Sequence, residues 1–300
     1  SSAASDVYKR QVFQGETFGL VGESGCGKSV TASSIMQLLP KLSRIESGAI
    51  TYHSEKGDIR IDQLPRNGKE MRALRGRDIA MIFQDPMTAL NPVYTIGFQI
   101  GEDLKYHTDL DKRSRRARTL ELLTQMGIST PEKRIDQYPH EFSGGMRQRV
   151  LIAMGIAAGA DLVLADEPTK GLDRRRIALV EDAFQRLGER TLLCVTHDLR
   201  FAHAISSRVV VMYASQQIES GDSPSFFAEP LHPYSRAMLE ALPENGLRAN
   251  MGFAPPRQDV DAQSVCHFYG RCPWRWERCR KSPPLMTVGK RKVRCWKYAD

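Results

Sequence analysis

The chain has 300 residues, of which 41% are hydrophobic and 26% charged, with a formal net charge of +8. This composition is typical of a globular protein and excludes a disordered or fibrous one. A chain of this length buries roughly three quarters of its unfolded surface, so a sizeable core is expected. Its longest apolar run, "VLIAMGIAAGA", stops after eleven residues, about half of what a membrane-spanning helix needs.

The N-terminal residues 1–11 have no clear periodicity and no secretory signal, and we treat them as a non-native or disordered segment. Cys26 and Cys194 lie alone in separate motifs, which does not resemble an extracellular disulfide framework. The sequence therefore favours a reducing, cytoplasmic location.

The first informative segment is "ETFGLVGESGCGKSVTASSIMQLLP", residues 16–40. It predicts a short buried strand, a glycine-rich loop and a helix that ends before Pro40. The loop has the spacing G-x-x-x-x-G-K-S, in which backbone N–H groups surround phosphate oxygens at a helix N-terminus. An unliganded glycine-rich turn is the weaker alternative. The predicted nucleotide contacts are Gly22, Glu23, Ser24, Gly25, Cys26, Gly27, Lys28, Ser29 and Val30.

Two further strands are predicted to end in chemically active side chains. In "DLVLADEPT", residues 161–169, a buried strand places Asp166 at its carboxyl end as an Mg²⁺ carboxylate beside the Ser29 hydroxyl, and Glu167 can polarise the attacking water. "TLLCVTHD" carries His197 in the same position, where it can contact a γ-phosphate. A solvated acidic turn and a structural histidine are the alternatives.

The segment "QYPHEFSGGMRQRVLIAMGIAAG" predicts a helix that opens at Ser143-Gly144-Gly145. This is a second anion-receptive N-terminus, which suggests a dimer in which each chain covers the nucleotide of the other. A simple N-cap formed by Ser143 is the alternative.

Taken in order, these motifs resemble an ABC transporter ATPase from about Glu16 to the end. "GESGCGKS" is similar to Walker A, "DLVLADEP" to Walker B and "FSGGMRQR" to the family signature. Gln84 in "MIFQDPMTALNP" resembles the Q-loop and His197 the H-loop. Stretches such as "YPHEFSGGMRQR" and "LHPYSRAMLEALP" resemble most closely the importers of dipeptides, oligopeptides and nickel.

The resemblance implies an α/β fold, a P-loop (RecA-like) nucleotide-binding domain at 12–230 with an antiparallel β subdomain and a helical subdomain at about 85–155. A C-terminal extension occupies 231–300. Glu167, His197 and Gln84 would be catalytic, and Gln84 would also approach Mg²⁺. ATP would lie between this chain and the signature of a second ABC ATPase subunit, a related heterodimer partner in most such permeases.

The further partners implied are two transmembrane permease subunits and, indirectly, an extracytoplasmic solute-binding protein. The chain would be peripheral, on the cytoplasmic face of the inner (plasma) membrane. Transported solutes other than peptides, including nickel, remain open alternatives. No nucleic acid partner is expected: only 57 residues separate Gln84 from Phe142, too few for the long coiled coil of repair ATPases.

The sequence departs from the family in two places that bear on function. The D-loop reads "TKGLD", residues 169–173, where "TTALD" is commoner. The aromatic residue that stacks on adenine in the family is expected upstream of Tyr8, so a weakened adenine contact is expected.

The tail carries four cysteines, all three tryptophans, and, from Arg271 onward, ten Lys or Arg against two acids. Its residues 231–259, "LHPYSRAMLEALPENG" and "MGFAPPRQD" included, are interpreted as a linker. Four thiolates favour zinc or an iron–sulfur cluster, and the resemblance implies a four-iron cluster that the tryptophans would shield. Free thiols on a basic, lipid-facing surface are the alternative. The predicted ligands are Cys266, Cys272, Cys279 and Cys295.

Overall fold

The computed structural model describes residues 10–188, 190–246 and 265–299. The chain forms two compact units. The first unit consists of Ser1–Gln11, Phe18–Asp62 and His197–Asp300, and the second of Val12–Thr17 and Gln63–Thr196.

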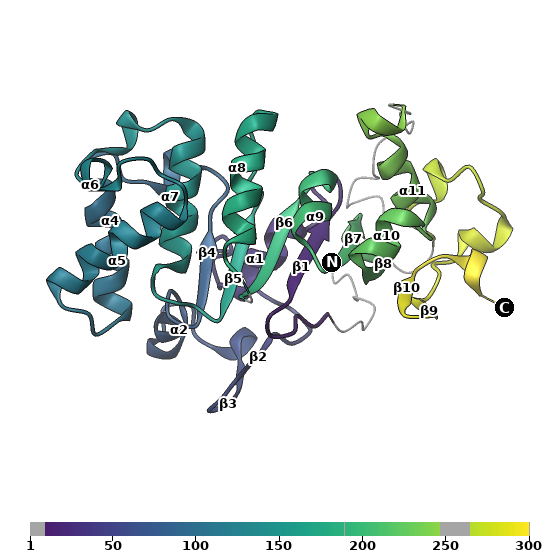
Figure 1. Ribbon diagram of the computed structural model, residues 1–300. Helices are drawn as coiled ribbons and strands as arrows, with labels where there is room; N and C mark the ends of the chain where they lie inside the picture. Colours follow the sequence, from purple (N-terminus) through teal and green to yellow (C-terminus); the bar gives the residue numbers. More distant parts are fainter. Residues whose placement is uncertain (1–9, 189, 247–264, 300) are drawn as a thin grey trace. The chain divides into compact units, whose positions relative to one another are not determined.

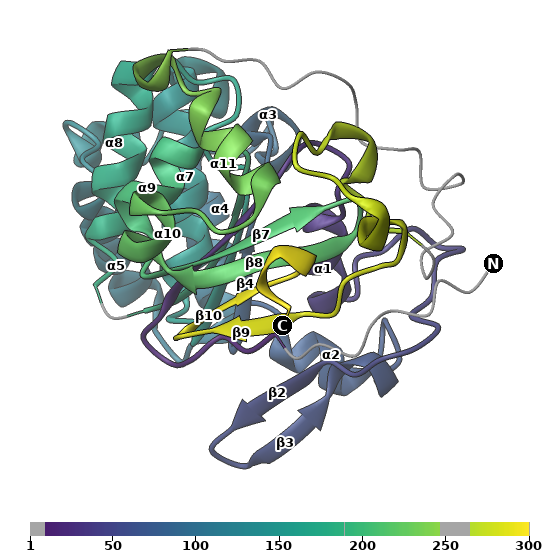
Figure 2. The same cartoon turned by 90° about the vertical axis from the view of Figure 1, so that its right-hand side faces the viewer.

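The first unit contains the strand order β1-β7-β8-β10-β9. Strand β1 (Thr17–Val21) runs parallel to β7 (Arg208–Tyr213), which is antiparallel to β8 (Gln216–Asp222). Strand β10 (Arg291–Val293) pairs antiparallel with β8 and with β9 (Met286–Val288), as Figure 2 shows. The C-terminal residues therefore extend the sheet that contains β7 and β8. A separate hairpin is formed by β2 (Thr51–Ser54) and β3 (Gly57–Arg60).

The helices of the first unit are α1 (Lys28–Ile35), α9 (Leu199–Ile205), α10 (Ser223–Ala228) and α11 (Pro233–Glu240). Helices α10 and α11 lie beside β7 and β8 (Figures 1 and 2). The core of this unit combines alternate positions of the strands with large side chains from the C-terminal third of the chain. It includes Val21, Val209, Val211, Tyr213, Ile218, Phe226, Tyr234, Leu239 and Phe268.

The linker prediction was wrong for the part of it that the structure describes, residues 231–246. Tyr234 and Leu239 of α11 are buried in the core. The fully buried carboxylate of Glu219 accepts hydrogen bonds from the N–H groups of Leu231 and His232, both at 2.8 Å. The proline that indicated a linker stands in the first turn of α11, where its missing N–H costs nothing. The remainder, including "MGFAPPRQD", lies outside the described residues.

The second unit contains three parallel strands in the order β4-β5-β6. They are β4 (Ile79–Ile82), β5 (Leu162–Asp166) and β6 (Thr191–Thr196), and Asp166 is in register with Val195. Every residue of β6 is buried, as expected of a strand covered on both faces.

Most of the second unit is helical: α2 (Lys69–Leu74), α3 (Pro86–Ala89), α4 (Ile96–His107), α5 (Lys112–Gln125), α6 (Pro131–Arg134), α7 (Gly144–Ala157) and α8 (Arg174–Gln185). Helix α7 packs against α4, α5, α8 and β4 (Figure 1). Gly155 permits this approach, because a Cβ there would lie 2.7 Å from the Ile82 side chain. Across the described ranges, no helix is long and apolar enough to cross a membrane.

Candidate nucleotide site

Residues 22–30 form one continuous loop and helix start in the first unit, between β1 and α1. Gly22 has a φ of +152°, and a Cβ at this position would lie 2.2 Å from the backbone oxygen of Met212. The loop thus leaves β1 in direct contact with the end of β7, an approach that only glycine allows. Ser24, Gly25, Ser29 and Val30 are exposed.

The loop holds its lysine through its own backbone carbonyls. Lys28 is only 4% exposed, and its Nζ donates to the backbone oxygens of Gly22 at 2.7 Å and Glu23 at 3.0 Å. Cys26 is buried beside it, with Sγ 3.9 Å from Nζ, and burial raises the pKa of this thiol. Lys28, which is predicted to bind phosphate, is therefore a buried cation whose position is set by the shape of the loop.

Glu23 connects the loop to the C-terminal third of the chain. Its carboxylate accepts two hydrogen bonds from the Arg271 guanidinium, and its N–H donates to the hydroxyl of Tyr234. Sequence reasoning assigned Glu23 to the nucleotide but missed both of these partners. Arg271 was read only as part of a basic tail, and no local pattern separates it from the other nine cations there.

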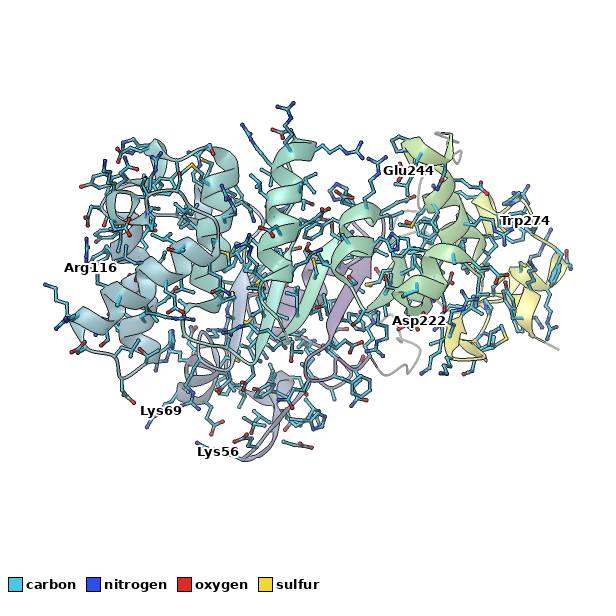
Figure 3. All side chains as sticks on the ribbon, viewed as in Figure 1. Lys56, Lys69, Arg116, Asp222, Glu244 and Trp274 are labelled. Atoms are coloured by element: carbon cyan, nitrogen blue, oxygen red, sulfur yellow. The ribbon has the colours of Figure 1, made fainter. Side chains whose placement is uncertain are left out.

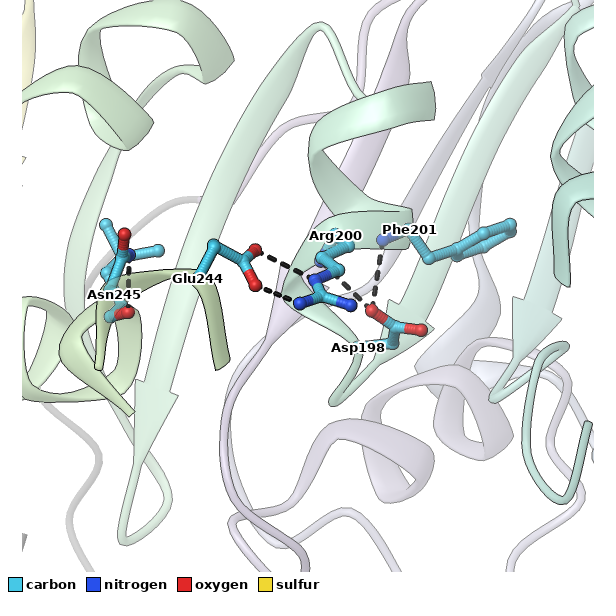
Figure 4. A network of polar contacts seen from close by, with 6 residues as sticks. Asp198, Arg200, Phe201, Glu244 and Asn245 are labelled. Atoms are coloured by element: carbon cyan, nitrogen blue, oxygen red, sulfur yellow. Dashed lines mark hydrogen bonds and ion pairs between the residues drawn. The ribbon is translucent and has the colours of Figure 1, made fainter. Parts of the chain in front are cut away.

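His197, also in the first unit, is exposed and lies two residues before helix α9. The carboxylate of Asp198 caps this helix by accepting from the N–H groups of Arg200 at 3.0 Å and Phe201 at 3.1 Å. The Arg200 guanidinium in turn forms an ion pair with Glu244, in the 3₁₀ turn Pro243–Asn245 (Figure 4). The chain after His197 is thereby fixed to the segment that follows α11.

In the second unit, β5 places Asp166 at its carboxyl end, followed by Glu167. The two residues are 7% and 6% exposed, and the Glu167 N–H donates to the Val195 oxygen at 2.8 Å. Glu167 has a φ of +49°, a left-handed conformation that costs free energy in a residue with a side chain. Such conformations gather at functional sites, where the surrounding structure enforces them.

The other predicted residues of the second unit lie at element ends. Gln84 is half-buried in the turn between β4 and α3. Ser143 caps α7, with Oγ accepting from the Met146 N–H at 3.3 Å, so Gly144 and Gly145 form its first turn. Asp173 of the D-loop caps α8 in the same way.

The tail thiols lie close enough to influence one another. Burial raises the pKa of Cys266 to about 12, and the thiols of Cys279, Cys295 and Cys272 add to the increase. Cys266 also donates its N–H to the Cys279 oxygen at 3.1 Å. All four cysteines are free thiols, and within the described residues no group of three or more potential ligands has a metal-binding arrangement. The proposed cluster therefore remains a prediction.

Two of the three tail tryptophans are exposed, and their expected role of shielding a cluster stays a prediction. Trp274 and Trp276 are 55% and 48% exposed, and Trp274 lies at the surface of the C-terminal segment (Figure 3). Trp296 is half-buried and donates its Nε1–H to the Lys281 oxygen. The tail is anchored instead by buried apolar side chains, of which Phe268, 1% exposed, is the largest. Tyr8 and the predicted adenine contact lie outside the described residues.

Comparison with known proteins decides the family. A model described as "ABC transporter" matches residues 7–170, and one described as "Oligopeptide/dipeptide transporter, C-terminal region" matches residues 218–279. The chain belongs to the ABC transporter family. Among relatives of this ABC ATPase, the dipeptide transport ATP-binding protein DppD of Haemophilus influenzae is 44% identical, covering 97% of this chain and 89% of the relative. The DppD protein of Bacillus subtilis is 41% identical, covering 95% and 86%.

Solved structures agree with the fold. A dimeric post-hydrolysis ATP-binding cassette bound to ADP and Pi is similar to this ABC ATPase with a TM-score of 0.58 and 25% sequence identity, covering 71% of this chain and 88% of that one. The predicted α/β P-loop fold and ATP hydrolysis are thus confirmed. The second family model ends at Cys279, so it contains three of the four tail cysteines.

Proposed function

We propose that this ABC ATPase hydrolyses ATP to drive the import of dipeptides or oligopeptides. The observation that supports the substrate class most directly is the match of residues 218–279 to the second family model, because that model is described for oligopeptide and dipeptide transporters. The relatives named for dipeptide transport extend over nearly the whole chain. Import of nickel or another solute by the same family is the alternative.

The proposed assembly places the chain at the cytoplasmic face of the inner membrane. A second, related ATPase subunit and two transmembrane permease subunits would complete it, and a solute-binding protein would deliver the peptide. The solved dimeric cassette supports the ATPase pairing. The proposed assembly includes no nucleic acid partner.

The chemistry follows from the side chains already described. Lys28 would bind the β- and γ-phosphates, which fits its burial within the loop carbonyls. Ser29 and Asp166 offer the hydroxyl and carboxylate oxygens that Mg²⁺ prefers, and the ion would neutralise phosphate charge. Glu167 would accept a proton from the attacking water, while Gln84 and His197 would contact the γ-phosphate. Ser143, Gly144 and Gly145 would face the nucleotide of the partner ATPase.

The substrate is tested in the assembled transporter. Vesicles that contain the complete permease and ATP are expected to accumulate a labelled dipeptide only when the solute-binding protein presents it. A labelled nickel chelate and free amino acids serve as competing solutes. Accumulation of the nickel chelate without the dipeptide would overturn the peptide assignment while leaving ATP hydrolysis in place.

We further propose that the four tail thiols hold a four-iron cluster, with zinc as the alternative. The proposal rests on the chemistry of four cysteines, since thiolates are the ligands that such clusters take; ligation would require each thiol to lose its proton, which burial opposes at Cys266. Protein purified without oxygen is expected to contain iron and acid-labile sulfide in matching amounts. Both should be lost together in the Cys272→Ser and Cys279→Ser variants.

The matched control is Cys194→Ala, which removes a buried thiol of β6 outside the tail. It should leave the iron and sulfide content unchanged. If zinc is found in place of iron, the prediction of four cysteine ligands is retained and the prediction of an iron–sulfur cluster is contradicted. Absence of any metal would leave the tail as a basic docking surface with free thiols.

A further inference from the structure

A two-pronged ion pair joins the phosphate loop to the C-terminal extension. Arg271 Nη1 lies 3.0 Å from Glu23 Oε2, and Nη2 lies 2.9 Å from Oε1. Both residues belong to the first unit, although 248 positions separate them in sequence. A planar guanidinium that binds both oxygens of a carboxylate fixes its orientation as well as its position.

The Arg271 side chain is itself held firmly. Its guanidinium lies over the rings of Tyr213, Tyr234 and Phe268, at 5.6, 6.0 and 5.7 Å from their centroids. Only 9% of the side chain is exposed, against 37% for Glu23. A largely buried cation among aromatic faces loses little further entropy when it binds its carboxylate, so this pair is stronger than a surface ion pair.

Glu23 is held through three different groups. Its carboxylate is bound by Arg271, its N–H donates to Tyr234 Oη at 3.0 Å, and its carbonyl accepts from Lys28 Nζ at 3.0 Å. One of the two carbonyls that hold Lys28 Nζ therefore belongs to the residue that Arg271 orients, and the other belongs to the adjacent Gly22. Arg271 and Tyr234 both come from the C-terminal third of the chain.

We propose that Arg271 is a positioning residue that keeps the phosphate loop in its nucleotide-binding shape. The inference rests on the proposed ATP site. A loop ordered before binding avoids the entropy loss of ordering it during binding, and affinity rises accordingly. Loss of Arg271 should therefore weaken ATP binding and raise KM, while kcat at saturating ATP changes little because Arg271 touches no reacting atom.

The test measures ATP affinity and steady-state hydrolysis of the full chain. Arg271→Met, which keeps much of the apolar stem, is expected to bind ATP about tenfold more weakly, with kcat within about twofold of the parent. Arg271→Lys keeps the charge but not the two-pronged geometry, and an intermediate loss is expected. The matched control is Arg280→Met, which removes an exposed arginine of the same extension that pairs with Glu277 and Tyr269, both within the extension. Its ATP affinity should equal that of the parent.

A double-mutant cycle tests whether Arg271 affects ATP binding through Glu23. If Arg271 acts through Glu23, adding Arg271→Met to Glu23→Gln should weaken ATP binding much less than it does in the parent. Independent, additive losses would overturn the proposal, as would unchanged affinity in a folded Arg271→Met protein. If Arg271→Met does not fold, the ATP affinity of Arg271→Lys tests the proposal instead. An affinity equal to that of the parent would then overturn it. Failure of the parent to bind ATP would instead contradict the proposed function.

Discussion

Replacing Glu167 with Gln is expected to lower ATP turnover at least 100-fold while ATP binding persists. An amide of nearly the same size cannot accept the proton of the attacking water, and removal of a general base costs about 10² to 10⁴ in rate. Glu167 is buried and its N–H is fixed to Val195, so the backbone should retain its conformation. Phosphate release and the affinity for ATP are the two measurements.

The control for this variant is Glu132→Gln, which changes an exposed carboxylate of α6 by the same chemistry. Its turnover should match that of the parent. Undiminished hydrolysis in Glu167→Gln would refute the role given to Glu167, and loss of ATP binding together with turnover would show that the residue supports the fold of the site instead.

Replacing Phe268 with Ala is expected to destabilise the protein by about 3–5 kcal/mol, as for other fully buried aromatic side chains. Phe268 is 1% exposed, and its ring lies 5.3 Å from Tyr213 and 5.6 Å from Tyr234, centroid to centroid. The cavity would open between the C-terminal extension and the sheet. A fall in the urea concentration at the unfolding midpoint measures the effect.

Trp274→Ala provides the comparison, because this larger side chain is 55% exposed (Figure 3). The substitution also removes the contact between the Trp274 ring and the Arg236 guanidinium. The expected loss in the free energy of unfolding is nevertheless about 1 kcal/mol or less. Equal destabilisation by the two substitutions would contradict the assignment of Phe268 as the anchor of the extension.

Local sequence signals were sufficient where strand, turn and helix follow one another directly. The glycine spacing between β1 and α1 and the apolar run before Asp166 need no distant partner to be recognised, and both segments lie where the sequence placed them. The N-cap by Ser143, which the sequence analysis gave as the alternative to a nucleotide contact, is present. Which of these side chains act on the nucleotide remains a prediction.

Contacts between residues far apart in the sequence could not be predicted from local patterns. Pro233 favoured a linker because proline interrupts helices, but whether it begins one depends on the core that Tyr234 enters. The tryptophans were expected to shield a cluster because the short tail has little other core, whereas Phe268 is the aromatic side chain that packs beside Tyr213. Likewise, the partner of Glu23 is one arginine among many, and only the fold selects Arg271.

The pairing of Glu23 with Arg271 also has a consequence for synthesis. The phosphate loop is synthesised early, and Arg271, which binds its Glu23 carboxylate, is added 248 residues later. At about 5–20 residues per second, this interval lasts roughly 12–50 s. During most of its translation a nascent chain therefore lacks the side chain that binds the Glu23 carboxylate. A ribosome that stalls between His197 and Arg271 releases a fragment with every nucleotide motif but without the arginine that orients Glu23. Full nucleotide affinity would then mark a finished chain.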